Sequence, residues 1–208
     1  MKLQVALDRI SLEEAINLAL KLDGNVDIIE IGTSLIKDYG NKAIEKIKAV
    51  TLKSQLLVDS KTIDEGAYEF KQAFKHGADI VTVMGAASVQ TLSACYEVAQ
   101  QHGGTMMIDL LNLNHEQIAE IDNFSEAIYL LHHSVDTNET VQAVTEIAEF
   151  QKLHEHIEHI AIAGGIDYDT TEELALQGVV EAVVVGSKII KSENIIETAK
   201  KFMEVLKV

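Results

Sequence analysis

Proline is absent from this chain of 208 residues, and cysteine and arginine occur once each. Without proline, the helix ends must rely on Gly, Asn, Asp and Ser. The single cysteine, Cys95, excludes an internal disulfide and is typical of a reducing compartment. No catalytic motif surrounds Cys95, so we expect it to pack within a helix. Because Arg9 is the only arginine, bidentate guanidinium clamps on an anion are nearly unavailable.

Positive charge is also scarce. The chain has 17 Lys and Arg residues against 33 Asp and Glu residues, a formal net charge of -16. Such an acidic protein is a poor partner for nucleic acid or for an anionic membrane. A small anionic substrate is not excluded, because a metal ion, one lysine and a few backbone amides can reverse the sign of the charge locally.

Long apolar runs are missing too. No run approaches the roughly 18 residues that span a bilayer. Segment 1–8 is too short, and turns acidic too soon, for a signal peptide. We therefore expect a cytoplasmic protein without a membrane partner. Hydrophobic residues make up 47% of the chain, enough for a sizeable core, so we expect one domain over residues 1–208.

The chain does contain one repeated unit, a short β-branched run followed by a helical stretch. The expected strands are Leu3–Leu7, Val26–Ile31, Gln55–Val58, Ile80–Val83, Thr105–Ile108, Ala127–Leu131, His159–Ala163 and Ala182–Val185. The expected helices are Leu12–Leu22, Leu35–Val50, Glu65–Lys75, Val89–Gln101, Glu116–Ile121, Glu139–His154, Thr171–Gln177 and Asn194–Leu206. This alternation predicts a parallel sheet with right-handed crossovers.

Eight such units in about 200 residues indicate an α/β fold of the (β/α)₈, or TIM barrel, type. The alternative is an open doubly wound sheet, which should carry a Gly-rich turn after its first strand. The residues there are Asp8-Arg9-Ile10-Ser11, so that turn is missing.

The most informative motif is D-x-K-x-x-D, formed by Asp59, Lys61 and Asp64 after the apolar run 56–58. On an extended strand, Asp59 and Lys61 share a face. Asp64 then falls where a helix should begin. Charges at the mouth of a core are costly without partners. The motif therefore indicates either a buried ion pair with a helix cap or a reactive site.

Polar residues close most of the other strands as well, at the end where barrel enzymes keep their active sites. They are Asp8, Glu30, Asp109, and His132 with His133. Glu30 and Asp59 come from adjacent strands and suit Mg²⁺, which prefers one or two carboxylates together with water and substrate oxygens.

Glycines follow the last two strands, at Gly164, Gly165 and Gly186, and Ser187 comes next. Loops at these places in barrels often bind phosphate through backbone N–H groups at a helix N-terminus. Glycine lets the backbone approach an anion closely. These residues are candidates for phosphate binding, with simple chain turns as the alternative.

Several of these segments together resemble a known family. The chain is similar to the 3-hexulose-6-phosphate synthases of the orotidine 5′-monophosphate decarboxylase suprafamily, from residue 2 to about residue 190. The D-x-K-x-x-D motif marks the suprafamily. Asp109 resembles the synthases more than the sister 3-keto-L-gulonate-6-phosphate decarboxylases, which usually have glutamate there. The matching segments are Ala6–Asp8, Ile29–Thr33, Asp59–Gly66, Gly77–Val83 and Ala163–Ile166.

The resemblance implies a lyase of carbohydrate metabolism in the ribulose monophosphate pathway. It would be a magnesium-dependent aldolase that condenses formaldehyde with D-ribulose 5-phosphate, through an enediolate, to D-arabino-3-hexulose 6-phosphate. Mg²⁺ would be held by Glu30 and Asp59. Lys61 would supply a fixed positive charge, and His132 would move a proton.

The remaining roles also follow from the resemblance. Asp8 and Asp109 would position Lys61 or the substrate hydroxyls. Asp64 would reach across an interface into the partner's site, which implies an obligate homodimer.

Two departures from the family pattern leave alternatives open. The chain reads His132-His133-Ser134 where the family has His-Thr-Gly, and no loop arginine follows. His133 is therefore a second candidate for proton transfer. Lys188 either replaces the lost positive charge or is solvated. The alternatives for function are a decarboxylase of a keto-sugar phosphate and a non-catalytic sugar-phosphate binder. A metal site among His154, His156 and His159 is not expected.

Overall fold

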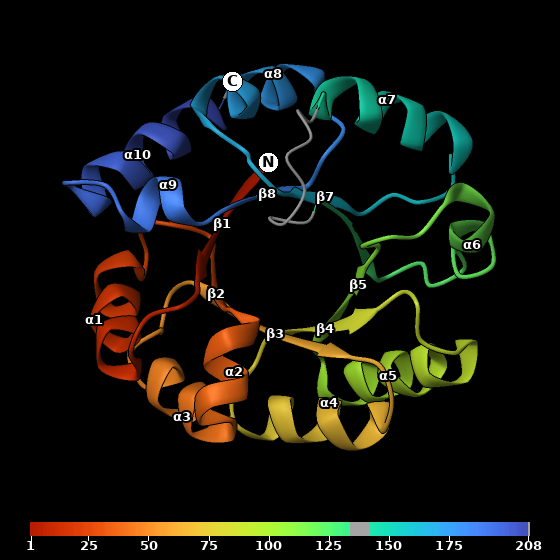
Figure 1. The fold of residues 1–208 in the computed structure, drawn as a ribbon, viewed down its shortest axis with the longest axis horizontal. Coiled ribbons are helices and arrows are strands. Elements are labelled where there is room, and N and C mark those ends of the chain that lie inside the picture. The colour runs from red at the N-terminus through yellow and green to blue at the C-terminus, as the bar shows by residue number, and fades with distance from the viewer. Residues whose placement is uncertain (134–141, 208) are drawn as a thin grey trace.

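The computed structural model describes residues 1–133 and 142–207. It is a closed barrel in which parallel strands pair in chain order and β8 returns to pair with β1 (Figure 1). The strands are β1 (Lys2–Leu7), β2 (Ile28–Ile31), β3 (Gln55–Thr62), β4 (Ile80–Met84), β5 (Thr105–Asp109), β6 (Ile128–His132), β7 (Ile160–Ala163) and β8 (Ala182–Val185). The expected TIM barrel is confirmed. The open doubly wound sheet is wrong, because its edge strands would not pair.

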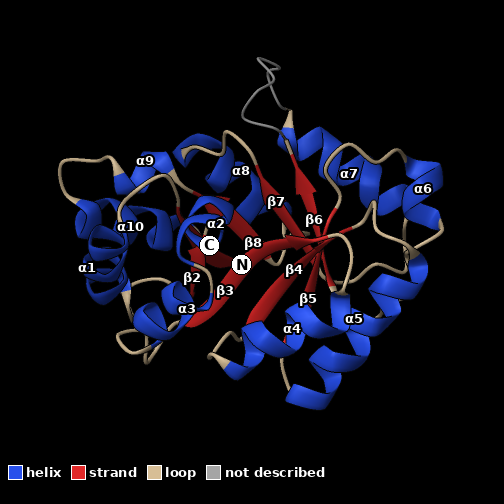
Figure 2. Cartoon of the chain, turned by 60° about the horizontal axis from the view of Figure 1, so that its bottom comes forward, coloured by secondary structure: helices blue, strands red, loops and turns tan. Residues whose placement is uncertain are grey.

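Helices enclose the barrel, as Figures 1 and 2 both show. Among the described residues, every helix is too short or too polar to span a bilayer. The helices are α1 (Leu12–Leu22), α2 (Thr33–Tyr39), α3 (Asn41–Lys48), α4 (Gly66–Lys75), α5 (Val89–His102), α6 (His115–Ala119), α7 (Ala143–Leu153), α8 (Tyr168–Gln177), α9 (Ser187–Ile190) and α10 (Ile195–Val205). The helix expected from Glu139 begins, in its described part, at Ala143; residues 139–141 lie outside the described residues.

The single helix expected over Leu35–Val50 is wrong, because this stretch forms two helices, α2 and α3. Gly40 separates them with φ +56, in the left-handed region that favours glycine. The Gly40 N–H bonds to the Ile36 carbonyl over 2.8 Å and so ends α2. A glycine inside a helical pattern can end the helix, and here it does.

The core has two layers. The outer and larger layer packs the strands against the surrounding helices. The inner layer fills the barrel with side chains such as Ile28, Leu57, Ile80 and Met107. On the β7 and β8 side, the inner layer contains only small residues, Ala161, Ala163 and Ala182, among its buried members. The barrel is therefore packed at its centre, and a binding site has to lie at one end.

A bulge in β3 shapes the end of the barrel that carries the D-x-K-x-x-D motif. Val58 pairs with Val81 and Thr62 pairs with Val83, so Asp59, Ser60 and Lys61 lie opposite the single residue Thr82. Lys61 has φ +48, a left-handed conformation that is uncommon outside glycine. We expected this strand to end at Val58. In the structure it continues through the irregular stretch to Thr62.

Candidate active site

A cavity of about 820 Å³, here called the main cavity, opens at the carboxyl ends of the strands. Nearly every candidate residue from the sequence lines it, although these residues come from segments far apart along the chain. They are Asp8, Glu30, Asp59, Lys61, His132, Gly164, Gly165, Gly186 and Ser187. The barrel thus brings the carboxylates, the lysine, the histidine and the glycine turns to one space.

Lys61 lies between two carboxylates. Its Nζ is 2.6 Å from Asp109 Oδ2 and 3.2 Å from the carboxylate of Asp59. Burial by itself lowers the pKa of Lys61, but the charges and hydrogen bonds of Asp59 and Asp109 outweigh burial and raise the pKa above its usual value. These contacts favour the charged form of Lys61 on the wall of the cavity.

Asp109 is fully buried behind Lys61 and also binds His132. Its Oδ2 accepts a hydrogen bond from His132 Nδ1 over 2.9 Å, and its Oδ1 accepts one from the Leu111 N–H over 3.0 Å. Burial alone would raise the pKa of Asp109. The hydrogen bonds and positive charges of His132 and Lys61 outweigh burial and lower the pKa to about 2. Because Nδ1 of His132 is engaged, Nε2 is the ring nitrogen that can exchange a proton with a ligand.

Asp59 is held by two threonines that the sequence analysis missed. Thr33 Oγ1 donates to Asp59 Oδ2 over 2.5 Å, and Thr82 Oγ1 donates to Asp59 Oδ1 over 2.8 Å. Both threonines line the main cavity. The hydroxyl groups fix the carboxylate and compensate its burial.

Glu30 is the most perturbed acid of the site. Burial, followed by the charge of Asp59, raises the pKa of Glu30 to about 8. Gln4 Nε2 donates to Glu30 Oε2 over 2.6 Å, while Gln4 Oε1 has no hydrogen-bond partner among the described residues. Gln4 was also missed, although it shares a strand face with Ala6 and Asp8, and a polar residue on that face was a usable signal.

These observations test whether the residues suit a magnesium ion. The negative charge of Asp59 disfavours the charged form of Glu30, and a cation would relieve this repulsion. The buried Oε1 of Gln4, which has no partner among the described residues, adds a further oxygen nearby. In the part of the chain that the structure describes, no three His, Cys, Asp or Glu side chains form a metal-binding cluster. A two-carboxylate site fits Mg²⁺, which keeps several waters or substrate oxygens. The residues present therefore suit the ion.

Asp8 was expected to position either Lys61 or the substrate hydroxyls, and its side chain contacts Ser34 instead of Lys61. Its Oδ1 accepts hydrogen bonds from both the backbone N–H and the hydroxyl of Ser34, near the start of α2. It remains on the cavity wall and its charge contributes to the raised pKa of Glu30, after burial and Asp59. Asp8 therefore lines the cavity without contacting Lys61, and its role toward substrate hydroxyls stays a prediction.

The glycine turns after β7 and β8 also line the main cavity. Gly164 and Gly165 have φ +106 and +70, and Gly186 precedes the short helix α9. Arg9, Lys188 and Lys191 line the same cavity, so it contains cations besides Lys61. Lys188 lines the cavity and is exposed, so both interpretations, replacement of the lost positive charge and a solvated lysine, stay open.

Asp64 is not among the described residues that line the main cavity. It is exposed, and its Oδ1 accepts the N–H of Glu65 over 2.8 Å, just before α4. Ile63 beside it is 54% exposed. The position before a helix is as expected, and the reach of Asp64 into a partner's site stays a prediction.

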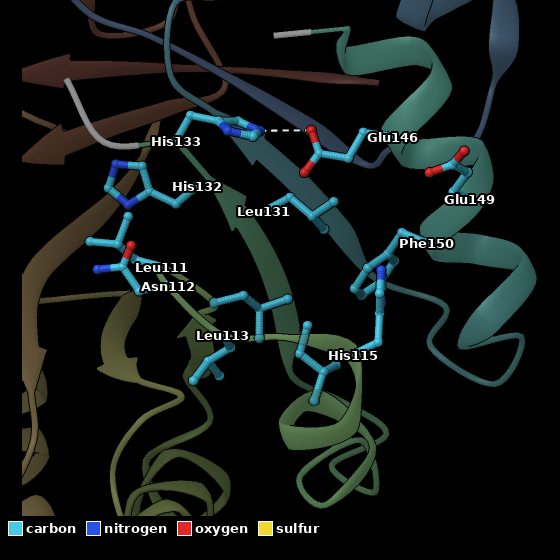
Figure 3. A pocket seen from close by; sticks show the side chains of 12 residues that line it. Leu111, Asn112, Leu113, His115, Leu131, His132, His133, Glu146, Glu149 and Phe150 are labelled. Atoms are coloured by element: carbon cyan, nitrogen blue, oxygen red, sulfur yellow. Dashed lines mark hydrogen bonds and ion pairs between the residues drawn. The ribbon is translucent and has the colours of Figure 1, made fainter. Parts of the chain in front are cut away.

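A second cavity of about 250 Å³, the side cavity, is lined by residues 110–113 after β5, by the end of β6, and by α6 and α7 (Figure 3). His133 points into it, and its Nε2 donates to Glu146 Oε2 over 2.7 Å. His132 points the other way in Figure 3 and lines both cavities. Strand alternation explains the opposite directions. His132, and not His133, is therefore the histidine beside Asp109.

The remaining histidines form side-chain pairs away from the main cavity. His115 Nδ1 is 3.2 Å from His154 Nε2, and His156 Nε2 is 2.8 Å from Asp122 Oδ2. His159 Nδ1 is 2.8 Å from Glu181. Burial and the charge of His115 lower the pKa of His154. His156 and His159 thus pair with acids of neighbouring loops, and His115 of α6 pairs with His154 at the end of α7.

Comparisons with known proteins agree with this geometry. Residues 1–202 match the profile of the orotidine 5′-phosphate decarboxylase / HUMPS family. A 3-hexulose-6-phosphate synthase from Staphylococcus epidermidis is 32% identical over 203 residues, covering 97% of this chain and 96% of that protein.

Solved structures give the same relationship. The 3-hexulose-6-phosphate synthase from Salmonella typhimurium superposes with a TM-score of 0.91 at 31% identity, over 100% of this chain and 99% of that one. A 3-keto-L-gulonate-6-phosphate decarboxylase from Vibrio cholerae superposes with a TM-score of 0.85 at 26% identity, over 99% and 97% of the two chains. The chain therefore belongs to the orotidine 5′-phosphate decarboxylase / HUMPS family.

Proposed function

We propose that this protein is an aldolase that condenses formaldehyde with D-ribulose 5-phosphate to give D-arabino-3-hexulose 6-phosphate. The observation that carries the proposal is the contact of Asp109 with both Lys61 and His132, beside the carboxylates of Glu30 and Asp59. This arrangement places a permanent cation and a titratable imidazole next to one another. The names of the relatives at about 30% identity support the substrate class.

The reaction needs a proton to be removed from C1 of the sugar phosphate and later returned. His132 Nε2 takes the C1 proton, which leaves an enediolate. Lys61 stabilises the negative charge of the enediolate because its ammonium group is already in place. The C1 carbon then attacks the carbon of formaldehyde, and the new alkoxide takes the proton back from His132.

Glu30 and Asp59 are the residues that would hold Mg²⁺. When bound, the ion supplies Lewis-acid stabilisation of negative charge on oxygen. Asp59 is fixed by Thr33 and Thr82, and Glu30 is oriented by Gln4. Such support of metal ligands is a common requirement for tight binding.

The phosphate group would bind at the turns after β7 and β8. Gly164, Gly165, Gly186 and Ser187 offer backbone N–H groups and one hydroxyl at the rim of the main cavity. Lys188 adds a positive charge nearby. The carbonyl end of the sugar would then reach Lys61 and His132, which line the same cavity.

We also propose a homodimer in which Asp64 completes the partner's site. The support is its exposed position at the end of the motif, next to the exposed Ile63, together with the family resemblance. A monomeric protein that is fully active would contradict this assignment.

A direct assay tests the reaction. The protein is mixed with ribulose 5-phosphate, formaldehyde and Mg²⁺, and the loss of formaldehyde is followed. We expect consumption that stops when EDTA removes the ion. No consumption, together with release of CO₂ from 3-keto-L-gulonate 6-phosphate, would favour the decarboxylase instead, which the Vibrio cholerae structure keeps as the second candidate. Binding of ribulose 5-phosphate with neither reaction would identify a non-catalytic binder.

A further inference from the structure

Thr82 lies in β4 opposite the bulge of β3. Between the pairs Val58–Val81 and Thr62–Val83, three residues of β3 face this single residue of β4. Thr82 is only 1% exposed, yet it lines the main cavity. Regular strand pairing is lost at this point, so the backbone and side chains of the bulge need other partners.

Thr82 contacts each of the three bulged residues. Its hydroxyl donates to Asp59 Oδ1 over 2.8 Å and accepts the N–H of Lys61 over 3.0 Å. Its backbone carbonyl accepts the hydroxyl of Ser60 over 2.8 Å. A hydroxyl has one hydrogen to donate and lone pairs to accept, so one side chain connects the carboxylate of Asp59 to the backbone of Lys61.

The contact to Lys61 falls on a residue with an unusual backbone. Lys61 has φ +48, and an L residue keeps such a conformation only where its surroundings enforce it. The same backbone directs the Lys61 side chain to Asp59 and Asp109. A contact that fixes the backbone of Lys61 therefore also affects the position of the Lys61 ammonium group.

We propose that Thr82 is a positioning residue that sets the placement of the Lys61 ammonium group relative to the Asp59 carboxylate. Its hydroxyl acts by binding the Asp59 carboxylate and the Lys61 N–H at the same time. Its effect on turnover rests on the proposed function, whereas its effect on the backbone of Lys61 does not.

Three variants test the proposal. Thr82→Val keeps the shape of the side chain and removes the hydroxyl, and Thr82→Ser restores the hydroxyl. Thr51→Val is the matched control, because Thr51 is also buried but, among the described residues, its hydroxyl binds only the Ile47 carbonyl, over 3.0 Å.

The first measurement is hydrogen exchange at the Lys61 amide, followed by NMR in the full-length protein. We expect exchange to be about 10-fold faster or more in Thr82→Val, and near the wild-type rate in Thr82→Ser and Thr51→Val. Equal protection of this amide in Thr82→Val and wild type would overturn the proposal. This measurement does not depend on any activity.

The second measurement separates kcat from KM. A displacement of a reacting group by about 1 Å costs roughly 100-fold in rate, so we expect kcat to fall by about that factor in Thr82→Val with KM nearly unchanged. Thr82→Ser should recover most of kcat. Equal losses in the Val and Ser variants, or a rise in KM alone, would count against positioning. If wild-type protein catalyses neither candidate reaction, the proposed function fails, and the amide exchange still decides the role of Thr82.

Discussion

The ammonium group of Lys61 lies 2.6 Å from the carboxylate of Asp109, a residue with no solvent exposure. The same carboxylate oxygen is 2.9 Å from His132 Nδ1. A buried acid thus holds the two groups to which we assign charge stabilisation and proton transfer. Removing either group should therefore affect turnover far more than binding of the sugar phosphate.

We expect Lys61→Ala to lower kcat by about 10²-fold or more, because it removes a preorganised charge from the site of developing negative charge. Folding should stay near normal, since Asp109 keeps His132 as a partner. The matched control is Lys48→Ala, which breaks a 2.8 Å ion pair with Asp79 outside the cavity. Steady-state kinetics and circular dichroism check both variants. Wild-type kcat in Lys61→Ala would refute the role of this lysine.

Gly165→Ala tests the phosphate site, with Gly178→Ala as its control. Both glycines have φ +70, and at both a Cβ would meet no described atom within 4 Å. Each substitution should therefore cost a similar stability, about 1 kcal/mol. Of these two glycines, Gly165 lines the main cavity and Gly178 does not. We therefore expect KM for the sugar phosphate to rise in Gly165→Ala and to stay unchanged in Gly178→Ala. Equal KM values in the two variants would argue against phosphate binding at this turn.

Magnesium should change how stability depends on pH. Glu30 has a pKa of about 8 in the folded chain and a usual value of 4.5. Between these values the folded chain keeps a proton that the unfolded chain has lost, so stability without metal should fall as pH rises from about 5 to 8, by up to ~5 kcal/mol. Mg²⁺ should flatten this dependence. Thermal melts with EDTA and with Mg²⁺ measure it, and Glu30→Gln should remove the slope.

Gln4→Leu should weaken Mg²⁺ binding by about 10- to 100-fold, the usual effect of losing the partner of a metal ligand. The control is Gln177→Leu, because Gln177 also has a buried Oε1 with no partner among the described residues, but lies on α8. Isothermal titration calorimetry with Mg²⁺ alone compares them. Similar losses in both variants would show that the effect on Mg²⁺ is general to buried glutamines.

Mixing two inactive variants tests the shared site. If Asp64 of one protomer serves the partner's site, Lys61→Ala and Asp64→Ala should each be inactive, while mixed dimers contain one intact site. Refolding the two together should recover about a quarter of wild-type activity, as expected for random pairing in a twofold dimer. No recovery, with dimers confirmed by light scattering, would place Asp64 in the site of its own chain.

The gathering of several candidate residues in one cavity could be predicted from the sequence. Glu30, Asp59, Lys61 and His132 were found because parallel strands in a barrel bring their carboxyl ends together. The partners that fix these residues were not found. Thr33 and Thr82 are ordinary residues of their own segments, and only the three-dimensional pairing brings their hydroxyls to Asp59.

The local backbone was the other part that the sequence did not reveal. The alternation of an extended strand correctly put Asp59 and Lys61 on one side, but the structure achieves this through a bulge with Lys61 at φ +48. Glycine is the usual sign of a left-handed residue, and position 61 is a lysine, so the sequence did not indicate the bulge. At position 40 a glycine did indicate a break between two helices. The helical periodicity on both sides nevertheless led to the prediction of a single helix.

Gly164, in the turn proposed to bind phosphate, lies against the residue that follows β6. A Cβ added there would lie 2.6 Å from the His133 Cβ, and the His133 N–H bonds to the Ala163 carbonyl over 3.1 Å. The backbone at Gly164, which would bind the phosphate of a ligand, thus contacts the backbone of His133, the residue after His132. If the phosphate binds at this turn as proposed, its position and the orientation of the His132 ring would depend on neighbouring backbone atoms. A sugar lacking its phosphate should consequently be turned over slowly even at saturation.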